Sequence, residues 1–362
     1  MAQSSADVTR VLEALRNVRE PELGKDIVTL NMVKDLAVSG SSVSLTFVLT
    51  TPACPFKSEI EGSIREELRK LKGIEDVQIK WEAVVPKSRD MQGRAGIPGV
   101  KNIVAVASGK GGVGKTTVAV NLSIALQRMG ASVGLMDSDV YGPNIPRMMG
   151  VNGTPHAVGE RIQPLEGYGI RLMSMGFLTP PDRPLVWRGP MLHSVMQQFL
   201  RNVDWGELDY LILDLPPGTG DVQLSLTQTV PLAGGVIVTT PSDVALEDAR
   251  KAIGMFREVK VEVLGLVENM SYFLCPHCSE RIEIFSHGGG KKTAEQFGVP
   301  FLGEIPLDSE VRAGGDQGAP VATRGPESPQ AKSFYEIARR VAARVSVVDL
   351  TASPEELITI RP

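Results

Sequence analysis

One short stretch of the sequence has the residue types and spacing of a phosphate-binding loop. Residues 109–117 read G-K-G-G-V-G-K-T-T, which fits the pattern G-x-x-x-x-G-K-[ST] without a departure. Glycines let backbone N–H groups turn inward around a polyphosphate, and the N-terminus of the following helix adds partial positive charge. We expect Lys115 to reach the β- and γ-phosphates of ATP and Thr116 to supply a Mg²⁺ ligand. The residues expected to contact the nucleotide are Gly109, Lys110, Gly111, Gly112, Val113, Gly114, Lys115, Thr116 and Thr117.

A second lysine, Lys110, follows the first glycine of this loop. An ordinary phosphate-binding loop needs a single lysine, here Lys115. A cation at the outer shoulder of the loop cannot easily fold back onto its own γ-phosphate, but it can reach a nucleotide held by a facing subunit, as an arginine finger does. Lys110 therefore predicts a homodimer with a catalytic lysine acting in trans. The alternative is a solvated loop lysine.

Carboxylates follow two further apolar segments. Asp137 and Asp139 come after residues 132–136, and Asp214 comes after residues 210–213. A carboxylate at a strand end beside a phosphate-binding loop can anchor the water shell of Mg²⁺. We expect Asp214 to serve as this metal anchor and Asp139 to position the attacking water. Taken singly, each aspartate also suits a helix N-cap or a turn.

Two cysteines form a C-x-x-C pair at Cys275 and Cys278. Zinc and [4Fe–4S] sites usually need four ligands, and the third cysteine, Cys54, lies far away in the sequence. A two-fold dimer would bring two pairs together and complete a shared, exposed and easily released site. A zinc site and a redox pair are the alternatives. The redox pair is less favoured because residues 279–285 alternate like a strand, whereas redox cysteines begin a helix. We expect His277 and His287 to be surface residues.

Length and composition limit the class of protein. A chain of 362 residues suggests two domains. Its apolar content of 42% and charged content of 22% are ordinary for a globular protein. A net charge of −4 gives no basic field that would attract nucleic acid, and no apolar run is long enough to span a bilayer. We therefore expect neither a nucleic-acid nor a membrane partner. The N-terminus lacks a signal pattern, so we expect a cytoplasmic protein.

The elements that position these residues fall into an α/β pattern. Residues 102–108 read as a buried strand that enters the loop, and residues 118–129 read as the following helix. Alternating apolar strands and helices then predict a doubly wound, mostly parallel sheet that binds ligands at the carboxyl ends of its strands. The predicted divisions are a small α/β domain at 1–85, a linker at 86–100, an ATPase domain at 101–348 and a polar tail at 349–362.

Together these motifs resemble the MinD/Mrp group of dimeric P-loop ATPases. The segments Y-G-P-N, E-N-M-S and C-x-x-C are similar to the Mrp/ApbC branch of iron–sulfur carriers, and residues 1–85 resemble a cluster-assembly-factor domain. The resemblance implies that Lys110 crosses the dimer interface, that Asn269 reads the adenine ring and that Pro306 packs over the base. It also favours a bridging [4Fe–4S] cluster over the other uses of the cysteine pair.

The function implied is a slow ATP hydrolase coupled to cluster transfer, with apo iron–sulfur proteins as recipients and scaffold proteins as donors. The alternative is a MinD-like positioning or partition ATPase. That alternative needs a membrane-binding or DNA-binding surface, and the acidic segment 354–360 is a poor match to a basic interfacial helix. Cys54 is either a cluster-handling thiol or a small core residue.

Overall fold

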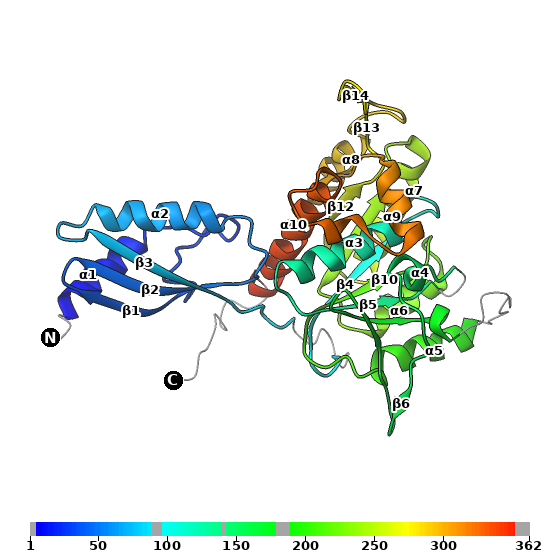
Figure 1. Cartoon of the computed structure of the whole chain (residues 1–362), viewed down its shortest axis with the longest axis horizontal. Coiled ribbons are helices and arrows are strands. Elements are labelled where there is room, and N and C mark those ends of the chain that lie inside the picture. The colour runs from blue at the N-terminus through cyan, green and yellow to red at the C-terminus, as the bar shows by residue number, and fades with distance from the viewer. Residues whose placement is uncertain (1–4, 89–95, 140–141, 179–188, 352–362) are drawn as a thin grey trace. The chain divides into compact units, whose positions relative to one another are not determined.

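The computed structural model describes residues 5–88, 96–139, 142–178 and 189–351 (Figure 1). The chain divides into two compact units, one formed by Met1–Pro86 with Ala342–Pro362 and the other by Lys87–Val341. Part of the predicted linker and residues 352–362 of the predicted tail lie outside the described residues. The predicted boundaries at 85, 100 and 348 stay predictions.

The first unit packs helices against a small mixed sheet. Strand β2 lies in the middle, antiparallel to β1 and parallel to β3. One core joins the buried side chains of Leu15, Phe47 and Ile64. The last turns of α10 (Pro329–Thr351) belong to this unit, and Ser346 Oγ donates to the carbonyl of Thr50 at 3.4 Å. The other elements are α1 (Ser5–Leu15), β1 (Val33–Ser39), β2 (Ser42–Leu49), α2 (Lys57–Arg69) and β3 (Asp76–Ala83).

The second unit is built on a large, mostly parallel sheet, as the sequence predicts. Within the described residues its strand order is β15-β12-β11-β4-β10-β5-β9-β8, and β8 alone runs antiparallel to its neighbour. The strands are β4 (Val100–Ala107), β5 (Val133–Asp137), β8 (Leu165–Gly167), β9 (Ile170–Ser174), β10 (Leu208–Asp214), β11 (Gly234–Thr239), β12 (Val263–Glu268) and β15 (Phe301–Glu304).

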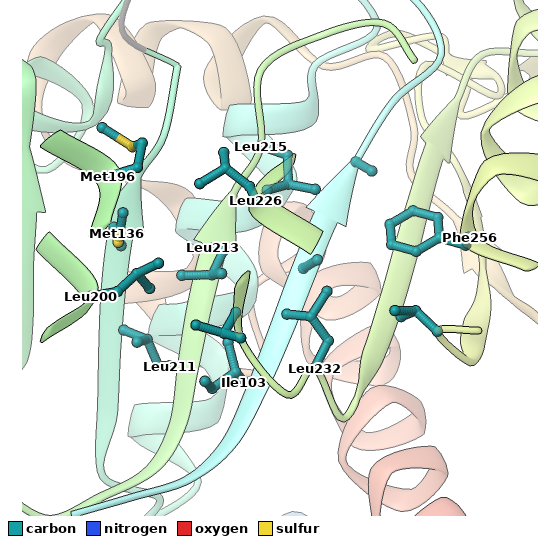
Figure 2. Close-up of a cluster of buried hydrophobic side chains, with 14 of the residues drawn as sticks. Ile103, Met136, Met196, Leu200, Leu211, Leu213, Leu215, Leu226, Leu232 and Phe256 are labelled. Atoms are coloured by element: carbon teal, nitrogen blue, oxygen red, sulfur yellow. The ribbon is translucent and has the colours of Figure 1, made fainter. Parts of the chain in front are cut away.

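Helices cover both faces of this sheet, which explains why its central strands are mostly apolar. One face carries a core in which Ile103, Leu211 and Leu213 of the sheet meet Leu226 and Phe256 of the covering helices (Figure 2). The elements outside the sheet are α3 (Lys115–Arg128), α4 (Ile145–Met148), α5 (Gly189–Arg201), α6 (Asp221–Thr229), α7 (Asp243–Glu258), α8 (Gly289–Phe297), α9 (Ser309–Gln317), the 3₁₀ turns at Met175–Phe177 and Val321–Arg324, and the hairpins β6 (Ala157–Val158) with β7 (Arg161–Ile162) and β13 (Phe273–Leu274) with β14 (Arg281–Ile282).

The strand order determines where the candidate site residues lie. Strand β10 inserts between β4 and β5, so the ends of three parallel strands meet at one edge. In this register Asp214 lies beside Asp137 on one side and Val106 on the other. The phosphate-binding loop and the strand-end aspartates are therefore brought together by topology. In the described part of the chain, no helix combines the length and apolarity needed to cross a membrane.

Candidate functional site

A pocket of about 450 Å³ opens at this edge of the sheet. Most of the residues predicted to form the site line it, and they come from the glycine loop, the end of β5 and two loops farther along the chain. The predicted residues on its wall are Gly111, Gly112, Gly114, Lys115, Thr116, Thr117, Asp139, Asn269 and Pro306.

The glycine loop contains two residues with positive φ, Gly112 and Gly114. Gly114 has φ of 82° and directly precedes α3, so the chain turns sharply into the helix. A Cβ at this position would lie 2.1 Å from Asn269 Nδ2. That amide in turn donates to the carbonyl of Val113 at 2.8 Å. The predicted base-reading residue is thus held against the phosphate-binding loop.

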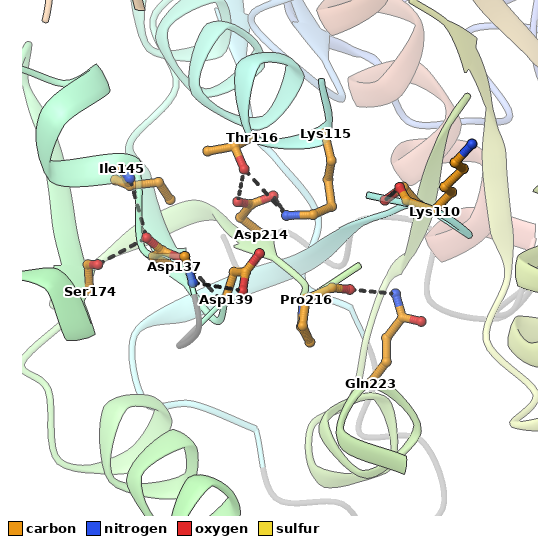
Figure 3. Close-up of polar contacts among 12 residues, drawn as sticks. Lys110, Lys115, Thr116, Asp137, Asp139, Ile145, Ser174, Asp214, Pro216 and Gln223 are labelled. Carbon is orange, nitrogen blue, oxygen red and sulfur yellow. Dashed lines mark hydrogen bonds and ion pairs between the residues drawn. The ribbon is translucent and has the colours of Figure 1, made fainter. Parts of the chain in front are cut away.

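The invariant features of the motif, a lysine and a hydroxyl, converge on Asp214. Lys115 Nζ lies 2.6 Å from Asp214 Oδ1, and Thr116 Oγ1 donates to Asp214 Oδ2 at 2.7 Å (Figure 3). The side chains of Lys115 and Asp214 are 6% and 0% exposed. A hydroxyl and a carboxylate this close are the oxygen ligands that Mg²⁺ prefers, directly or through its waters. The donor set fits the predicted magnesium site.

Asp139 lies on the pocket wall, at the start of the loop after β5. Its backbone N–H donates to Asp137 Oδ1 at 3.0 Å, and its own Oδ1 accepts from Gly142 N at 3.3 Å. The carboxylate predicted to position water is therefore placed by contacts at its own backbone and side chain.

Asp137 is a strand-end carboxylate to which the sequence analysis gave no role. It is 1% exposed, and its Oδ2 accepts from Ser174 Oγ at 3.0 Å and from Ile145 N at 3.3 Å (Figure 3). It thereby joins the ends of β5 and β9 to the start of α4. Burial, together with the neighbouring Asp214, raises the pKa of Asp137 to about 8. The sequence signal that could have indicated a role for Asp137 is its position as the first acid of D-x-D, directly at a strand end.

Lys110 does not take part in the cluster around Asp214. Its side chain is exposed and points away from Lys115 and Asp214 (Figure 3). Its carbonyl accepts from Ser108 Oγ at 2.9 Å, which fixes the backbone of the loop shoulder. This placement agrees with a lysine that does not serve its own phosphates, and the trans role stays a prediction.

Two short helices form the part of the pocket wall that sequence reasoning missed. Arg147 of α4 and Asp316 of α9 both line the pocket, and their charged groups are 3.9 Å apart. The two residues are separated by a long stretch of chain, so no local pattern could have paired them. The lining residues from these segments are Asn144, Arg147, Met148, Val311, Arg312, Gly315 and Asp316.

The cysteine pair lies in the hairpin of β13 and β14, which follows Asn269 in the chain. Cys275 N donates to Glu280 O at 2.9 Å, and Ser279 N donates to Cys275 O at 2.8 Å. Cys275 is partly exposed and Cys278 is exposed. Backbone N–H groups of His277 and Cys278 point at the Cys275 sulfur and lower its pKa, which favours a thiolate ligand.

The hairpin also bears on the alternatives for this pair. The predicted strand at 279–285 is shorter in the structure, where β14 covers Arg281–Ile282, and the first cysteine does not begin a helix. Among the described residues, no three His, Cys, Asp or Glu side chains gather into a metal-binding group. Cys54 belongs to the first unit, where burial raises its pKa to about 11.

The loop after β4, paired with the aspartate that ends β10, places this protein among the P-loop NTPases. The family described as NUBPL iron-transfer P-loop NTPase matches residues 99–342, and the family described as iron-sulfur cluster assembly protein matches residues 9–81. The chain belongs to the NUBPL iron-transfer family and carries a cluster-assembly domain in front.

Known relatives match most of the chain. An iron-sulfur cluster carrier protein of Synechocystis is 50% identical over 346 residues, which cover 94% of this chain and 98% of the relative. The iron-sulfur cluster transfer protein NUBPL of Mus musculus is 48% identical, with coverage of 79% and 89%.

Solved structures resemble the second unit. A nucleotide-binding protein of Archaeoglobus fulgidus in complex with ADP has a TM-score of 0.56 and 39% identity, covering 63% of this chain and 90% of its own. The cell division ATPase MinD of Pyrococcus furiosus has a TM-score of 0.51 and 25% identity, with coverage of 66% and 98%. The likeness to MinD is one of structure, and the family match favours iron transfer over the positioning ATPase.

The buried Lys115–Asp214 pair generates a first prediction. In the absence of nucleotide, Lys115→Ala should lower the free energy of unfolding by about 3–5 kcal/mol, because Asp214 is left buried without its cation. The double variant Lys115→Ala/Asp214→Asn should recover most of that loss. Neither variant should bind ATP. Urea unfolding and calorimetric titration measure the two effects separately. Unchanged ATP affinity in Lys115→Ala would contradict the loop assignment.

Asp137 generates a pH prediction. The folded chain keeps a proton on Asp137 up to pH about 8, whereas the unfolded chain loses it above about pH 4. The native state therefore binds more protons in this window, and this residue's contribution to stability should fall as the pH rises, by at most about 1.4 kcal/mol per pH unit. Asp137→Asn should remove that slope. Parallel wild-type and variant curves in urea unfolding across this range would show that Asp137 titrates normally.

Proposed function

We propose that this protein is an ATP-hydrolysing carrier of iron–sulfur clusters. It binds a [4Fe–4S] cluster between the Cys275 and Cys278 pairs of two copies and passes the cluster to apo-proteins. The observation that carries this proposal is an exposed C-x-x-C hairpin that follows Met270 of the nucleotide pocket closely in the chain, in a protein 50% identical to one named as a cluster carrier.

The chemistry of the cysteine pair supports a shared cluster. A [4Fe–4S] cluster takes four thiolates, and one hairpin supplies two. A second copy brings the other two to the same point, across a two-fold axis. Because Cys278 is exposed and Cys275 partly so, an acceptor can approach the cluster. The lowered pKa of Cys275 favours the thiolate that binds iron.

The nucleotide pocket supplies the residues for ATP hydrolysis. Lys115 contacts the phosphates, Thr116 and Asp214 hold Mg²⁺, and Asp139 orients the attacking water. Mg²⁺, when bound, neutralises the charge that develops on the transferred phosphoryl group. Asn269 and Pro306 contact the base, and Lys110 completes the site of the facing subunit. Support comes from the lining of the pocket and the contacts of Asp214.

Hydrolysis is slow in the proposed cycle, because each turnover is coupled to loading or transfer of a cluster. A scaffold protein donates the cluster, and apo iron–sulfur proteins accept it. The cytoplasm is the proposed place of action, since thiols stay reduced there.

Removal of the cysteine pair tests the function. After anaerobic reconstitution, the wild type should hold about four iron atoms per two chains. Cys275→Ser/Cys278→Ser should hold none and should fail to activate an apo-enzyme that needs a [4Fe–4S] cluster. It should still bind ATP, because the nucleotide pocket uses other residues. Mössbauer spectroscopy and iron and zinc analysis identify the bound metal.

Cys54→Ser is the matched control, since it removes the chain's remaining cysteine and leaves the hairpin intact. It should reconstitute like the wild type. A full cluster in the double-serine variant would refute the assigned ligands, and stoichiometric zinc in place of iron would refute the cluster.

Subunit mixing tests the trans role of Lys110. Lys110→Ala should bind ATP yet lose turnover. The nucleotide-dead Lys115→Ala/Asp214→Asn chain still offers Lys110 to a partner. A mixed dimer then has one complete site, formed by the intact loop of the first chain and the crossing lysine of the second. Activity should return on mixing, in phosphate-release assays. A tagged pull-down first establishes that heterodimers form, and inactive heterodimers would exclude the trans role.

A further inference from the structure

The segment that carries the cysteines is anchored at both ends on one buried carboxylate. Glu268, at the end of β12, is 0% exposed. Its Oε1 accepts from Ser271 Oγ at 2.6 Å, ahead of the hairpin, and its Oε2 accepts from Gly290 N at 2.5 Å, behind it. The residues between these anchors, 272–289, thus leave and rejoin the fold at the end of β12, and the next two residues after that strand, Asn269 and Met270, line the nucleotide pocket.

A second connection comes from within the hairpin itself. Arg281 of β14 places its guanidinium over the Tyr272 ring, 3.9 Å from the ring centroid. Arg281 Nη2 also donates to Glu304 Oε2 at 3.0 Å and lies 3.0 Å from His287 Nδ1. One planar cation therefore joins β14, the start of the hairpin and the end of β15.

The two main partners of Arg281 adjoin the lining of the nucleotide pocket. Tyr272 follows Met270 by two residues, and Glu304 precedes Pro306 by two, and both Met270 and Pro306 line the pocket. The backbones of these two loops are bonded together, since Leu307 N donates to Tyr272 O at 2.7 Å. Arg281 thus contacts both of the loops whose neighbouring residues line the part of the pocket that is predicted to hold the base.

A solvated surface arginine is the ordinary alternative, and the geometry argues against it. The side chain of Arg281 is 38% exposed, and that of Glu304 is 22% exposed. Such an ion pair is weak alone. Here the stacking on Tyr272 and the contact with His287 act on the same guanidinium, and Tyr272 and Glu304 each lie two residues from a residue that lines the pocket.

We propose that Arg281 is a positioning residue that couples occupancy of the nucleotide pocket to the hold of the hairpin on its iron–sulfur cluster. A base that packs against Met270 and Pro306 orders the wall, and Arg281 transmits that order to the strand beside the cysteines. The inference rests on the proposed carrier function. Coupling between two binding sites is reciprocal. Nucleotide therefore changes the affinity for the cluster, and the cluster changes the affinity for nucleotide, by the same factor.

The test compares Arg281→Ala and Arg281→Lys with the wild type. Arg281→Lys keeps the charge but loses the planar fork and the stacking surface. Arg161→Ala is the matched control, because Arg161 lies on the separate hairpin strand β7. Cluster release to a chelator is timed with and without ADP. In the wild type the release rates with and without ADP should differ. In both Arg281 variants the ratio of these two rates should be about three- to ten-fold closer to one than in the wild type.

A second measurement needs no cluster. Hydrogen exchange at the Cys275 and Ser279 amides should slow when ADP binds to the cluster-free wild type and to Arg161→Ala. In Arg281→Ala, ADP should not change the exchange rate of these amides. Glu304→Gln should lose the ADP effect in the same way, and the double variant Arg281→Ala/Glu304→Gln should show no further loss. This result would also distinguish coupling from a mere weakening of the hairpin.

The outcomes separate the two proposals. A wild type that binds no iron refutes the carrier function, whatever Arg281 does. A wild type that loads a cluster, together with Arg281 variants that keep the full nucleotide effect on release and on exchange, overturns the coupling role alone.

Discussion

The buried ion pair of Lys115 with Asp214 is the contact on which the nucleotide site depends. It joins the loop after β4 to the end of β10 through atoms that water hardly reaches. A buried carboxylate without a cation is costly, so the pair holds the start of α3 against the end of β10. In the proposed mechanism the lysine serves the phosphates and the carboxylate serves Mg²⁺, so ATP binding redistributes charge within an existing network. Thr116, bonded to the same carboxylate, is the second proposed metal ligand.

Much of the fold and of this site followed from the sequence because the signals are local. The loop pattern lies between an apolar strand and a helix, and parallel topology then brings the strand ends together, so the position of Asp214 and Asp139 beside the loop could be predicted. Their roles toward Mg²⁺ and water stay predictions. Arg147 and Asp316 could not, because their approach depends on how α4 and α9 pack. Asp137 and Glu268 resemble ordinary strand-end acids until burial and bonding partners are seen. The hairpin at the cysteines also escaped local reasoning, since backbone bonds at Cys275 replaced the predicted longer strand.

The two chemical sites share one stretch of backbone. Asn269 contacts the phosphate-binding loop, and the adjoining Glu268 anchors both ends of the cysteine segment. Gly290 has no side chain at the point where a Cβ would lie 2.7 Å from the Glu268 carboxylate. Nucleotide recognition and cysteine presentation are thus properties of a single strand end, which explains how a small exposed hairpin can be attached to a rigid ATPase core without a domain of its own.

The backbone amides around Cys275 have a consequence for the chemistry of an unloaded hairpin. By lowering the pKa of this thiol they raise the fraction of thiolate at neutral pH, and thiolate is the form that peroxides attack. Cys278 lies exposed beside it, so a sulfenic acid at one cysteine meets a resolving thiol at the other and closes to a disulfide. In the proposed carrier, iron bound to both sulfurs occupies the electron pairs that a peroxide attacks. Closure to a disulfide is therefore a reaction of the unloaded hairpin, and a hairpin closed in this way must be reduced before it can take up a cluster.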